Sequence, residues 1–292
     1  MRSIWTKTLR EYRVPMLAWG FGLAGLVYFT IVSYAQLSLS ARQDAAHFAS
    51  TLRFFGDPAA LTTPTGYATW KQLGSLPLIL GIWAVLAGAR LLRREEERHS
   101  LDLLLATPCS RLRVLVEKSA ALVVALAVIG ILIGLGALAG EAKAGVQVAA
   151  GGALLAGLNV SLAALVFAML ALLLAQVLRT AGAAAGLAGA VMTAAWLVDG
   201  TGRVADAGRL RQLSPLYYYG LSKPLIPSIG ANAGGIAALA FLALLFGGAS
   251  ILLFLGRDIG GVAWPHRVQA TPVRRDAPEP PYAAWSLRAV WA

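Results

Sequence analysis

Long apolar runs alternate with short charged stretches along this chain. A helix needs about 20 apolar residues to cross the hydrocarbon core of a bilayer. Six runs meet or approach that length, at about residues 15–36, 75–92, 116–139, 144–178, 180–198 and 235–256. Because these runs are continuously apolar and do not alternate, they indicate membrane helices and not the strands of a barrel. The pattern therefore predicts an all-α membrane protein with six transmembrane helices.

Composition agrees with this class. Hydrophobic residues make up 58% of the 292 residues and charged residues only 13%, whereas a soluble domain carries about 25% charged residues. The net charge is +11, but the basic residues stand at the ends of the apolar runs, as anchors beside a membrane do. No nucleic-acid partner is therefore expected. The only cysteine, Cys109, excludes an intrachain disulfide.

The first residues have a different character from the run that follows. Residues 1–14 mix Trp5 and Tyr12 with four basic residues, which fits a short interfacial helix on the cytoplasmic membrane surface. A continuation of the first membrane helix fits equally well. The uncharged run 14–41 exceeds the apolar core of a cleaved signal peptide, about 7–15 residues, so we expect a retained membrane helix.

Lysine and arginine counts predict the orientation. With both termini in the cytoplasm, the cytoplasmic pieces carry 17 of these residues and the external loops carry 8, as the positive-inside rule requires. The loop 199–224, which holds four of the eight, is the weakest point of this assignment. The predicted six-helix domain spans 15–260, with external loops 37–74 and 199–234 and a Pro-rich cytoplasmic tail at 261–292.

Sequence motifs for catalysis are absent. No lysine follows a glycine, so the chain has no P-loop for ATP. His47, His99 and His266 are far apart, a single cysteine cannot build a thiolate zinc cage, and no Gly-x-Ser-x-Gly elbow occurs. We therefore predict no catalytic residues, no metal site and no cofactor in this chain, and no enzyme activity of its own.

Charged groups inside the apolar runs are also scarce. Glu117, Lys118 and Asp199 stand at run edges, and the middles of all six runs are uncharged. Transporters driven by protons or sodium usually bury such groups near the middle of the membrane. An ion-driven mechanism would have to use amides such as Asn159, hydroxyls and backbone carbonyls. If the protein moves a substrate, the energy is expected from another subunit.

A dense charged cassette, RREEERHSLDLLLATPCSR, separates the second and third apolar runs. Ser100 suits a helix cap, Leu101, Leu104 and Leu105 share one helical face, and Pro108 stops the helix. These features predict a two-turn helix at 101–106, with a solvated extension of the second membrane helix before it. A solvated hairpin is the ordinary explanation of such charges. Leucines exposed at its tip, however, favour a protein partner.

The stretch 94–118 resembles the cytoplasmic signature of ABC-2-type transporter permeases, approximately Glu-Glu-Glu-Arg-Gly-Thr-Leu-Glu-Leu-Leu-Leu-Ala-x-Pro-x-Ser-Arg with a later Lys. The matching residues are Glu95, Glu96, Glu97, Arg98, Leu101, Leu103, Leu104, Leu105, Ala106, Pro108, Ser110, Arg111 and Lys118. Further similar stretches, such as LTTPTGYATW and LSPLYYYG, extend the resemblance over nearly the whole chain. One departure is His99-Ser100, where the family commonly has Gly-Thr or Gly-Ser; Ser100 preserves the cap, and the role of His99 is unexplained.

The resemblance implies the membrane-spanning permease subunit of a bacterial ABC exporter, multi-pass in the inner (plasma) membrane. A separate ABC ATPase subunit, with its own ATP and Mg, would dock on a coupling helix in the loop 93–113. The implied docking residues are Glu95, Glu96, Glu97, Arg98, His99, Ser100, Leu101, Leu104, Leu105, Pro108 and Arg111. Exchanging Glu96 and Arg98 for the opposite charges is predicted to weaken docking and leave the fold intact.

A second six-helix permease, either identical or similar, is also implied, and the chain could be half of a longer fused permease. Gly-x-x-x-Gly pairs at Gly130/Gly134, Gly136/Gly140 and Gly182/Gly186 allow close helix packing, within one subunit or between two. The transported substrate cannot be read from the sequence. An ATP-independent carrier or channel, or an accessory membrane scaffold, remains the alternative function.

Overall fold

Six helices of the protein are long and apolar enough to cross a membrane. The computed structural model describes residues 4–97, 110–146 and 150–256. The six are α1 (Ile4–Ala35), α4 (Leu76–Glu97), α6 (Arg111–Ala144), α7 (Ala150–Val177), α8 (Ala181–Val204) and α11 (Ala233–Gly256). Within the described residues no β-strand forms, and the only extended pairing is an isolated bridge between Lys223 and Gly230. The predicted all-helical class is therefore confirmed.

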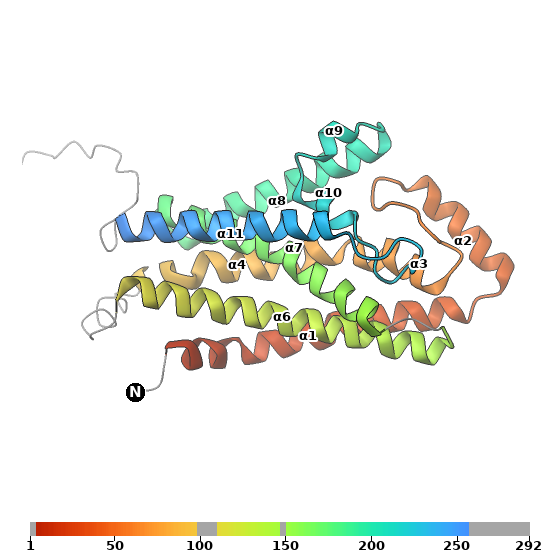
Figure 1. Ribbon diagram of the computed structural model, residues 1–292, viewed down its shortest axis with the longest axis horizontal. Helices are drawn as coiled ribbons and strands as arrows, with labels where there is room; N and C mark the ends of the chain where they lie inside the picture. The colour runs from red at the N-terminus through yellow and green to blue at the C-terminus, as the bar shows by residue number, and fades with distance from the viewer. Residues whose placement is uncertain (1–3, 98–109, 147–149, 257–292) are drawn as a thin grey trace, which may run out of the picture.

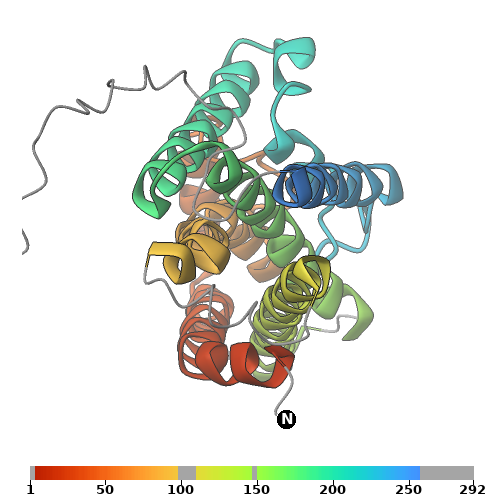
Figure 2. The same ribbon diagram turned by 90° about the vertical axis from the view of Figure 1, so that its left-hand side faces the viewer.

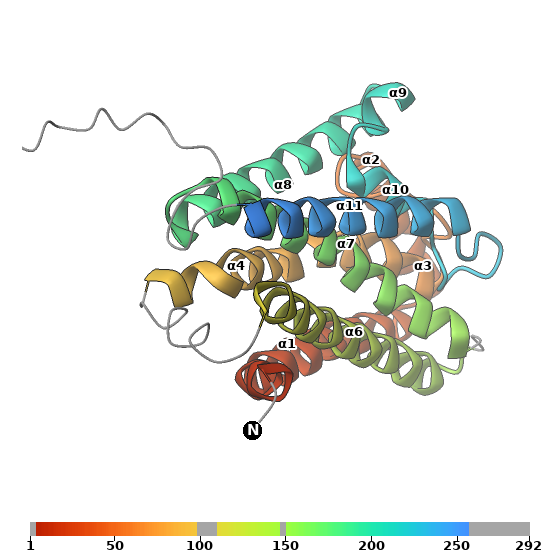
Figure 3. The same cartoon turned by 60° about the vertical axis from the view of Figure 1, so that its left-hand side comes forward.

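Helix α7 occupies the centre of the bundle. It packs against α4, α6, α8 and α11, while α1 lies along α6 at the edge. Figure 2 looks along the bundle and shows α7 in green among these neighbours, and Figure 3 shows the same layering from the side. Helices α1, α8 and α11 are the least buried of the six. Their outer faces are therefore available to lipid or to another subunit.

Small residues set the distances between the central helices. A Cβ on Gly157 of α7 would lie 2.0 Å from the carbonyl oxygen of Gly130 on α6, and a Cβ on Gly136 would lie 2.5 Å from the Ala24 oxygen on α1. Two of the predicted glycine pairs thus pack within the subunit, because only glycine lets these backbones approach. The third pair, Gly182/Gly186 on α8, has open space beside it.

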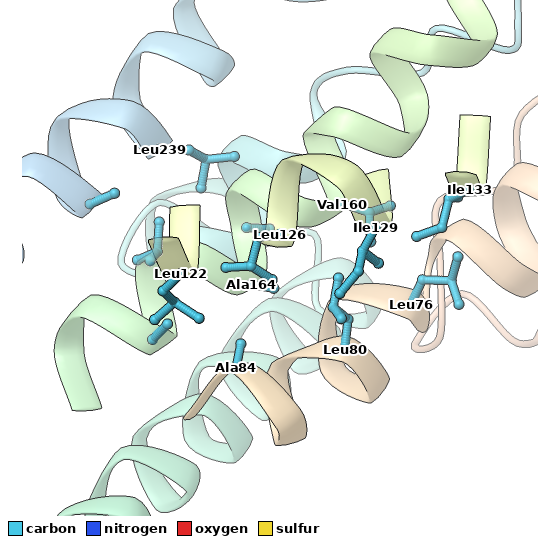
Figure 4. Packing of buried hydrophobic residues seen from close by; sticks show 14 of the residues in the cluster. Leu76, Leu80, Ala84, Leu122, Leu126, Ile129, Ile133, Val160, Ala164 and Leu239 are labelled. Carbon is cyan, nitrogen blue, oxygen red and sulfur yellow. The ribbon is translucent and has the colours of Figure 1, made fainter. Parts of the chain in front are cut away.

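Large apolar side chains fill the remaining space between these helices. Figure 4 shows Leu80 of α4, Ile129 of α6 and Val160 of α7 interlocking, with Leu239 of α11 at the side. All four are fully buried. In a bilayer the surrounding lipid is as apolar as leucine, so this core stabilises the fold through close packing and not through exclusion of water.

The N-terminal segment is part of α1. The sequence offered two interpretations of residues 1–14, and the described residues from Ile4 run without a break through Pro15 into the first membrane span. Figure 2 shows these first turns, the darkest red, lying across the end of the bundle while the rest of α1 runs along it. Proline removes one helical hydrogen bond and crowds the preceding turn, which explains a bend at this point.

The segments predicted as external loops contain helices. They are α2 (Leu39–Thr51), α3 (Pro64–Ala68), the π-helical turn η1 (Thr69–Leu73), α9 (Gly208–Arg211) and α10 (Pro215–Gly220). Figure 1 shows them gathered at the end of the bundle opposite to the N-terminus. Local caps explain why α3 and α10 form. The side chains of Thr63 and Ser214 accept hydrogen bonds from backbone N–H groups, and a proline follows each of these residues at the first helical position. We call this end of the protein the distal end.

The helix α6 extends beyond the predicted end of its apolar run. It continues to Ala144 and so includes Glu141, whose side chain is buried. Neither carboxylate oxygen of Glu141 has a hydrogen-bond partner within the part of the chain that the structure describes. This residue lies in the last turn of its helix, so the expectation of uncharged span middles is unaffected.

An ion pair joins two segments of the distal end. The carboxylate of Asp57, in the loop between α2 and α3, lies 3.0 Å from Nζ of Lys223, in the loop after α10. Burial by itself would raise the pKa of Asp57, but the hydrogen bond and charge of Lys223, with smaller contributions from Arg211 and Arg203, lower it below its ordinary value of 3.8. The pair therefore holds the two loops together over the neutral and mildly acidic range.

Acid should release this contact only below pH 3.8. Folding lowers the pKa of Asp57. The pair therefore stabilises the distal end fully above pH 3.8, the ordinary pKa of the group, and this stabilisation is lost as the pH falls through the lower pKa of the folded protein. The rate of backbone amide hydrogen exchange in residues 52–58 is expected to increase at the pH where Asp57 becomes protonated. The Asp57→Asn variant should exchange faster at neutral pH and show no such acid step; an acid step of equal size in this variant would contradict the assignment.

Candidate docking and coupling site

The structure describes both ends of the predicted docking loop. Glu95, Glu96 and Glu97 form the last turn of α4, and Arg111 is the first residue of α6. Ser110 caps α6 by accepting a hydrogen bond from the backbone N–H of Arg113. The other predicted docking residues lie outside the described residues, and so does the predicted helix at 101–106; they are Arg98, His99, Ser100, Leu101, Leu104, Leu105 and Pro108. We call the described ends, residues 93–97 and 110–118, the loop roots.

Glu96 is buried in an ion pair with Arg93. Its carboxylate lies 2.5 Å from a guanidinium nitrogen, and the Glu96 side chain is only 3% exposed. The same guanidinium donates two further hydrogen bonds, of 2.6 and 3.1 Å, to the carbonyl oxygen of Leu178 at the end of α7. A cation is favourable there because helix C-termini carry partial negative charge. The predicted solvated extension of the second membrane helix is therefore wrong for this residue, which is buried against α7.

Glu95 joins the two loop roots to each other. Its carboxylate lies 2.6 Å from Nζ of Lys118 on α6. Lys118 is itself buried and donates a hydrogen bond, 3.1 Å long, to the carbonyl oxygen of Leu91 on α4. Because Lys118 closes both contacts from one side chain, the end of α4 and the beginning of α6 are held at a fixed separation.

Glu97 holds the beginning of α8. One carboxylate oxygen accepts a hydrogen bond of 2.8 Å from the backbone N–H of Ala181, the first residue of that helix. The Thr180 side chain caps the same helix by accepting a hydrogen bond from the backbone N–H of Ala183. A carboxylate at a helix N-terminus satisfies an unpaired donor and also opposes the positive end of the helix dipole. Glu97 therefore attaches α8 to α4.

Glu117 performs the same role for α1. Its carboxylate accepts a hydrogen bond of 3.0 Å from the backbone N–H of Trp5 in the first turn of α1. The other oxygen of Glu117 accepts from Nε of Arg113 at 2.7 Å. This contact joins the first turn of α1 to the beginning of α6.

The loop roots thus hold the ends of three other membrane helices. We call the five residues that make these contacts the root clamp: Arg93, Glu95, Glu97, Glu117 and Lys118. Through them α4 and α6 are joined to the ends of α1, α7 and α8. A force applied to the loop would therefore reach all of these helices at once. Of the clamp residues, the sequence placed Glu95 and Glu97 in the docking set. It missed Arg93 and Glu117 because their partners lie 85 and 112 positions away.

A groove opens beside the Glu95–Lys118 pair, between α1, α4 and α6. It encloses about 880 Å³ with its mouth included. Tyr12 of α1 and Trp83 of α4 meet there edge to face, with ring centroids 5.9 Å apart. The aromatic rings of Tyr12 and Trp83 and the charged Glu95–Lys118 pair give this groove both apolar and polar surface.

Metal-binding geometry is not found among the described residues, where no three His, Cys, Asp or Glu side chains gather in a way that could hold an ion. The contacts around the loop roots are hydrogen bonds and ion pairs between helices, without a catalytic arrangement. Their geometry suits transmission of movement between helix ends.

Comparison with known proteins identifies the family of this chain. A family model described as ABC-2 family transporter protein matches residues 3–258, which include all six apolar helices and both loop roots. A search of curated proteins gave no match. Members of this family are transport permeases and not enzymes themselves. With a match over most of its length, the chain belongs to the ABC-2 family of transporter proteins and is a multi-pass membrane permease.

Proposed function

We propose that this permease is the membrane-spanning subunit of an ATP-binding cassette exporter, coupled to a separate ATPase subunit through residues 94–111. The observation that carries the proposal is the root clamp. Both ends of the loop are bonded to the ends of α1, α7 and α8. A connector that served only to join two helices would not need contacts with three others.

The proposed mechanism divides the work between two subunits. The ATPase subunit binds ATP and Mg, and its movement displaces the docking loop. Because Glu95 and Lys118 hold α4 and α6 together, the two loop roots move as one body. Arg93 and Glu97 then transmit this displacement to the facing ends of α7 and α8. The helices around the groove at Tyr12 and Trp83 would rearrange between inward-facing and outward-facing states.

A second permease, identical or similar, completes the proposed transporter. Helix α8 offers it a surface of small residues, since a Cβ on Gly182, Gly186 or Gly189 would meet no other atom within 4 Å. Such a surface allows another helix to approach closely. The low burial of α8 within the subunit supports this location for the contact.

The proposed orientation places the loop roots in the cytoplasm of a bacterial cell, with the protein in the inner membrane. Figure 1 shows the beginning of α1 and the end of α11 at the same end of the bundle as the loop roots. Three of the four basic residues in the loop 199–224, the weak point of the charge count, pair with carboxylates of the protein: Arg203 and Arg211 with Asp199, and Lys223 with Asp57.

Copurification and ATPase assays test this function. The full chain, expressed with a P-loop ATPase encoded beside it, is expected to retain that subunit in equal amounts through detergent purification. After reconstitution, substrate movement should require ATP hydrolysis. If the permease purifies alone and moves its substrate without ATP, the protein is a carrier or channel. If it purifies with other membrane proteins and moves nothing, it is a scaffold.

A further inference from the structure

A pocket lies at the distal end, far from the loop roots. It is formed where η1, α7, α8 and α10 meet the loop between α2 and α3. Its walls include Trp70, Leu73, Asn159, Trp196, Arg203 and Tyr219. The π-helical turn η1 supplies Trp70 and Leu73. Turns of this kind are rare and often mark functional sites.

Three of the residues that line this pocket each carry a buried polar atom without a hydrogen-bond partner in the described part of the chain. These atoms are the indole Nε1 of Trp70, the amide Oδ1 of Asn159 and the guanidinium Nε of Arg203. Asn159 is only 4% exposed. Buried polar groups are almost always hydrogen-bonded, because an unpaired one costs about 1–3 kcal/mol. Two unpaired donors and one unpaired acceptor on residues that line one pocket therefore indicate a binding site for a ligand with complementary groups.

The side chains that carry these atoms are already fixed by their other contacts. Asn159 donates through Nδ2 to the carbonyl oxygen of Tyr219, and the Tyr219 hydroxyl donates to the carbonyl oxygen of Leu73. Arg203 bonds the Asp199 carboxylate and donates 3.0 Å to the Phe54 carbonyl oxygen. The unpaired atoms are thus held in place before any ligand arrives, and such preorganisation favours binding.

Charge in the pocket favours an anion. The cations Arg203 and Arg211 share the single carboxylate of Asp199, which is itself fully buried. Lys223 is balanced by Asp57. These contacts leave one positive charge in excess beside the free Nε of Arg203. An acceptor group with negative charge would complete this arrangement.

We propose that the distal pocket binds a small anionic headgroup that also carries a hydroxyl. A phosphate or carboxylate oxygen accepts hydrogen bonds from Nε1 of Trp70 and Nε of Arg203, and the hydroxyl donates to Oδ1 of Asn159. The aromatic ring of Trp196 and the side chain of Leu216 line the rest of the pocket. This site does not depend on an ATPase partner.

The same headgroup chemistry is available from two sources, a membrane lipid and a soluble metabolite. Purified full-length protein in phosphatidylcholine nanodiscs is titrated with glycerol 3-phosphate and with glycerate, and binding is followed by calorimetry. A parallel series replaces part of the phosphatidylcholine with phosphatidylglycerol, followed by native mass spectrometry. Saturable binding of a soluble probe identifies a soluble ligand. Saturable binding of phosphatidylglycerol alone identifies a lipid.

The Trp70→Phe variant supplies the sharpest test. The indole N–H has no partner within the described chain, so phenylalanine keeps the aromatic wall and removes no internal hydrogen bond. Binding of the probe is expected to weaken about tenfold, as for loss of one hydrogen bond to a charged group. Arg203→Lys keeps the positive charge near Asp199 but removes Nε, and a similar loss is expected.

Ser161→Ala is the matched control. Ser161 is also buried on α7 with an unpaired oxygen, but it does not line the pocket. This variant should bind the probes as the unmodified protein does. The proposal is overturned if no probe or lipid binds saturably, or if Trp70→Phe and Arg203→Lys bind as tightly as the control. Thermal unfolding of each variant confirms that any loss does not come from misfolding.

Discussion

Replacing Arg93 by methionine is expected to lower the free energy of unfolding by about 3–5 kcal/mol, the range measured when one partner of a buried ion pair is removed. The variant removes the cation that pairs with the buried Glu96 carboxylate and both donors to the Leu178 carbonyl oxygen. Methionine fits the space of the arginine stem, so lost packing contributes little. Thermal unfolding in detergent, followed by intrinsic fluorescence, measures the effect.

A second substitution separates the contribution of the ion pair to stability from that of packing. In the double variant Arg93→Met with Glu96→Met both charges of this pair are removed together, so most of the lost stability should return. Arg93→Met is also expected to weaken ATP-dependent transport while ATPase docking is kept, because the loop is intact and only its contact with α7 is lost. Unchanged stability in the single variant, or equal loss in both variants, would show that the pair is not structural.

Replacing Leu104 and Leu105 together by aspartate is expected to release the ATPase subunit from the detergent-purified complex and to abolish transport. Both leucines lie on one face of the helix predicted at 101–106. Burying two charges at a docking surface costs more free energy than a typical contact contributes to binding. A pull-down with the tagged permease, quantified by the ratio of the two subunits, measures the loss.

Leu103→Asp is the matched control for the docking face. It introduces the same charge in the same predicted helix, but position 103 falls on the opposite face. The subunit ratio should therefore change much less than in the double variant. Normal recovery of the ATPase with Leu104→Asp and Leu105→Asp would exclude the leucine face as the contact.

The charge exchange of Glu96 and Arg98 no longer serves as a docking test. From the sequence it was expected to leave the fold intact. The structure places Glu96 against Arg93, 3% exposed, so an arginine at position 96 would put two cations together in a buried site. Destabilisation would then obscure any effect on docking. Arg98→Glu alone, with Glu96 kept, is the cleaner variant.

The sequence by itself determined the membrane class, the number of spans and the position of the charged loop between the second and third spans. These features depend on local patterns: continuous apolar runs about 20 residues long and a dense run of charged residues between two of them. It also identified the small-residue pairs on α6, because their spacing is read along one helix. Each of these signals lies within a few positions of the feature it predicts.

Only the tertiary structure decided which groups meet across helices. Arg93 reaches Leu178, Glu97 reaches Ala181, and Glu117 reaches Trp5, over separations of 85, 84 and 112 positions. Such contacts depend on how α7 packs between its neighbours, and no local pattern encodes them. The same reason applies to the distal pocket, where Trp70 and Arg203 are ordinary in sequence. Their significance comes from burial without a partner, and burial is a property of the assembled helices.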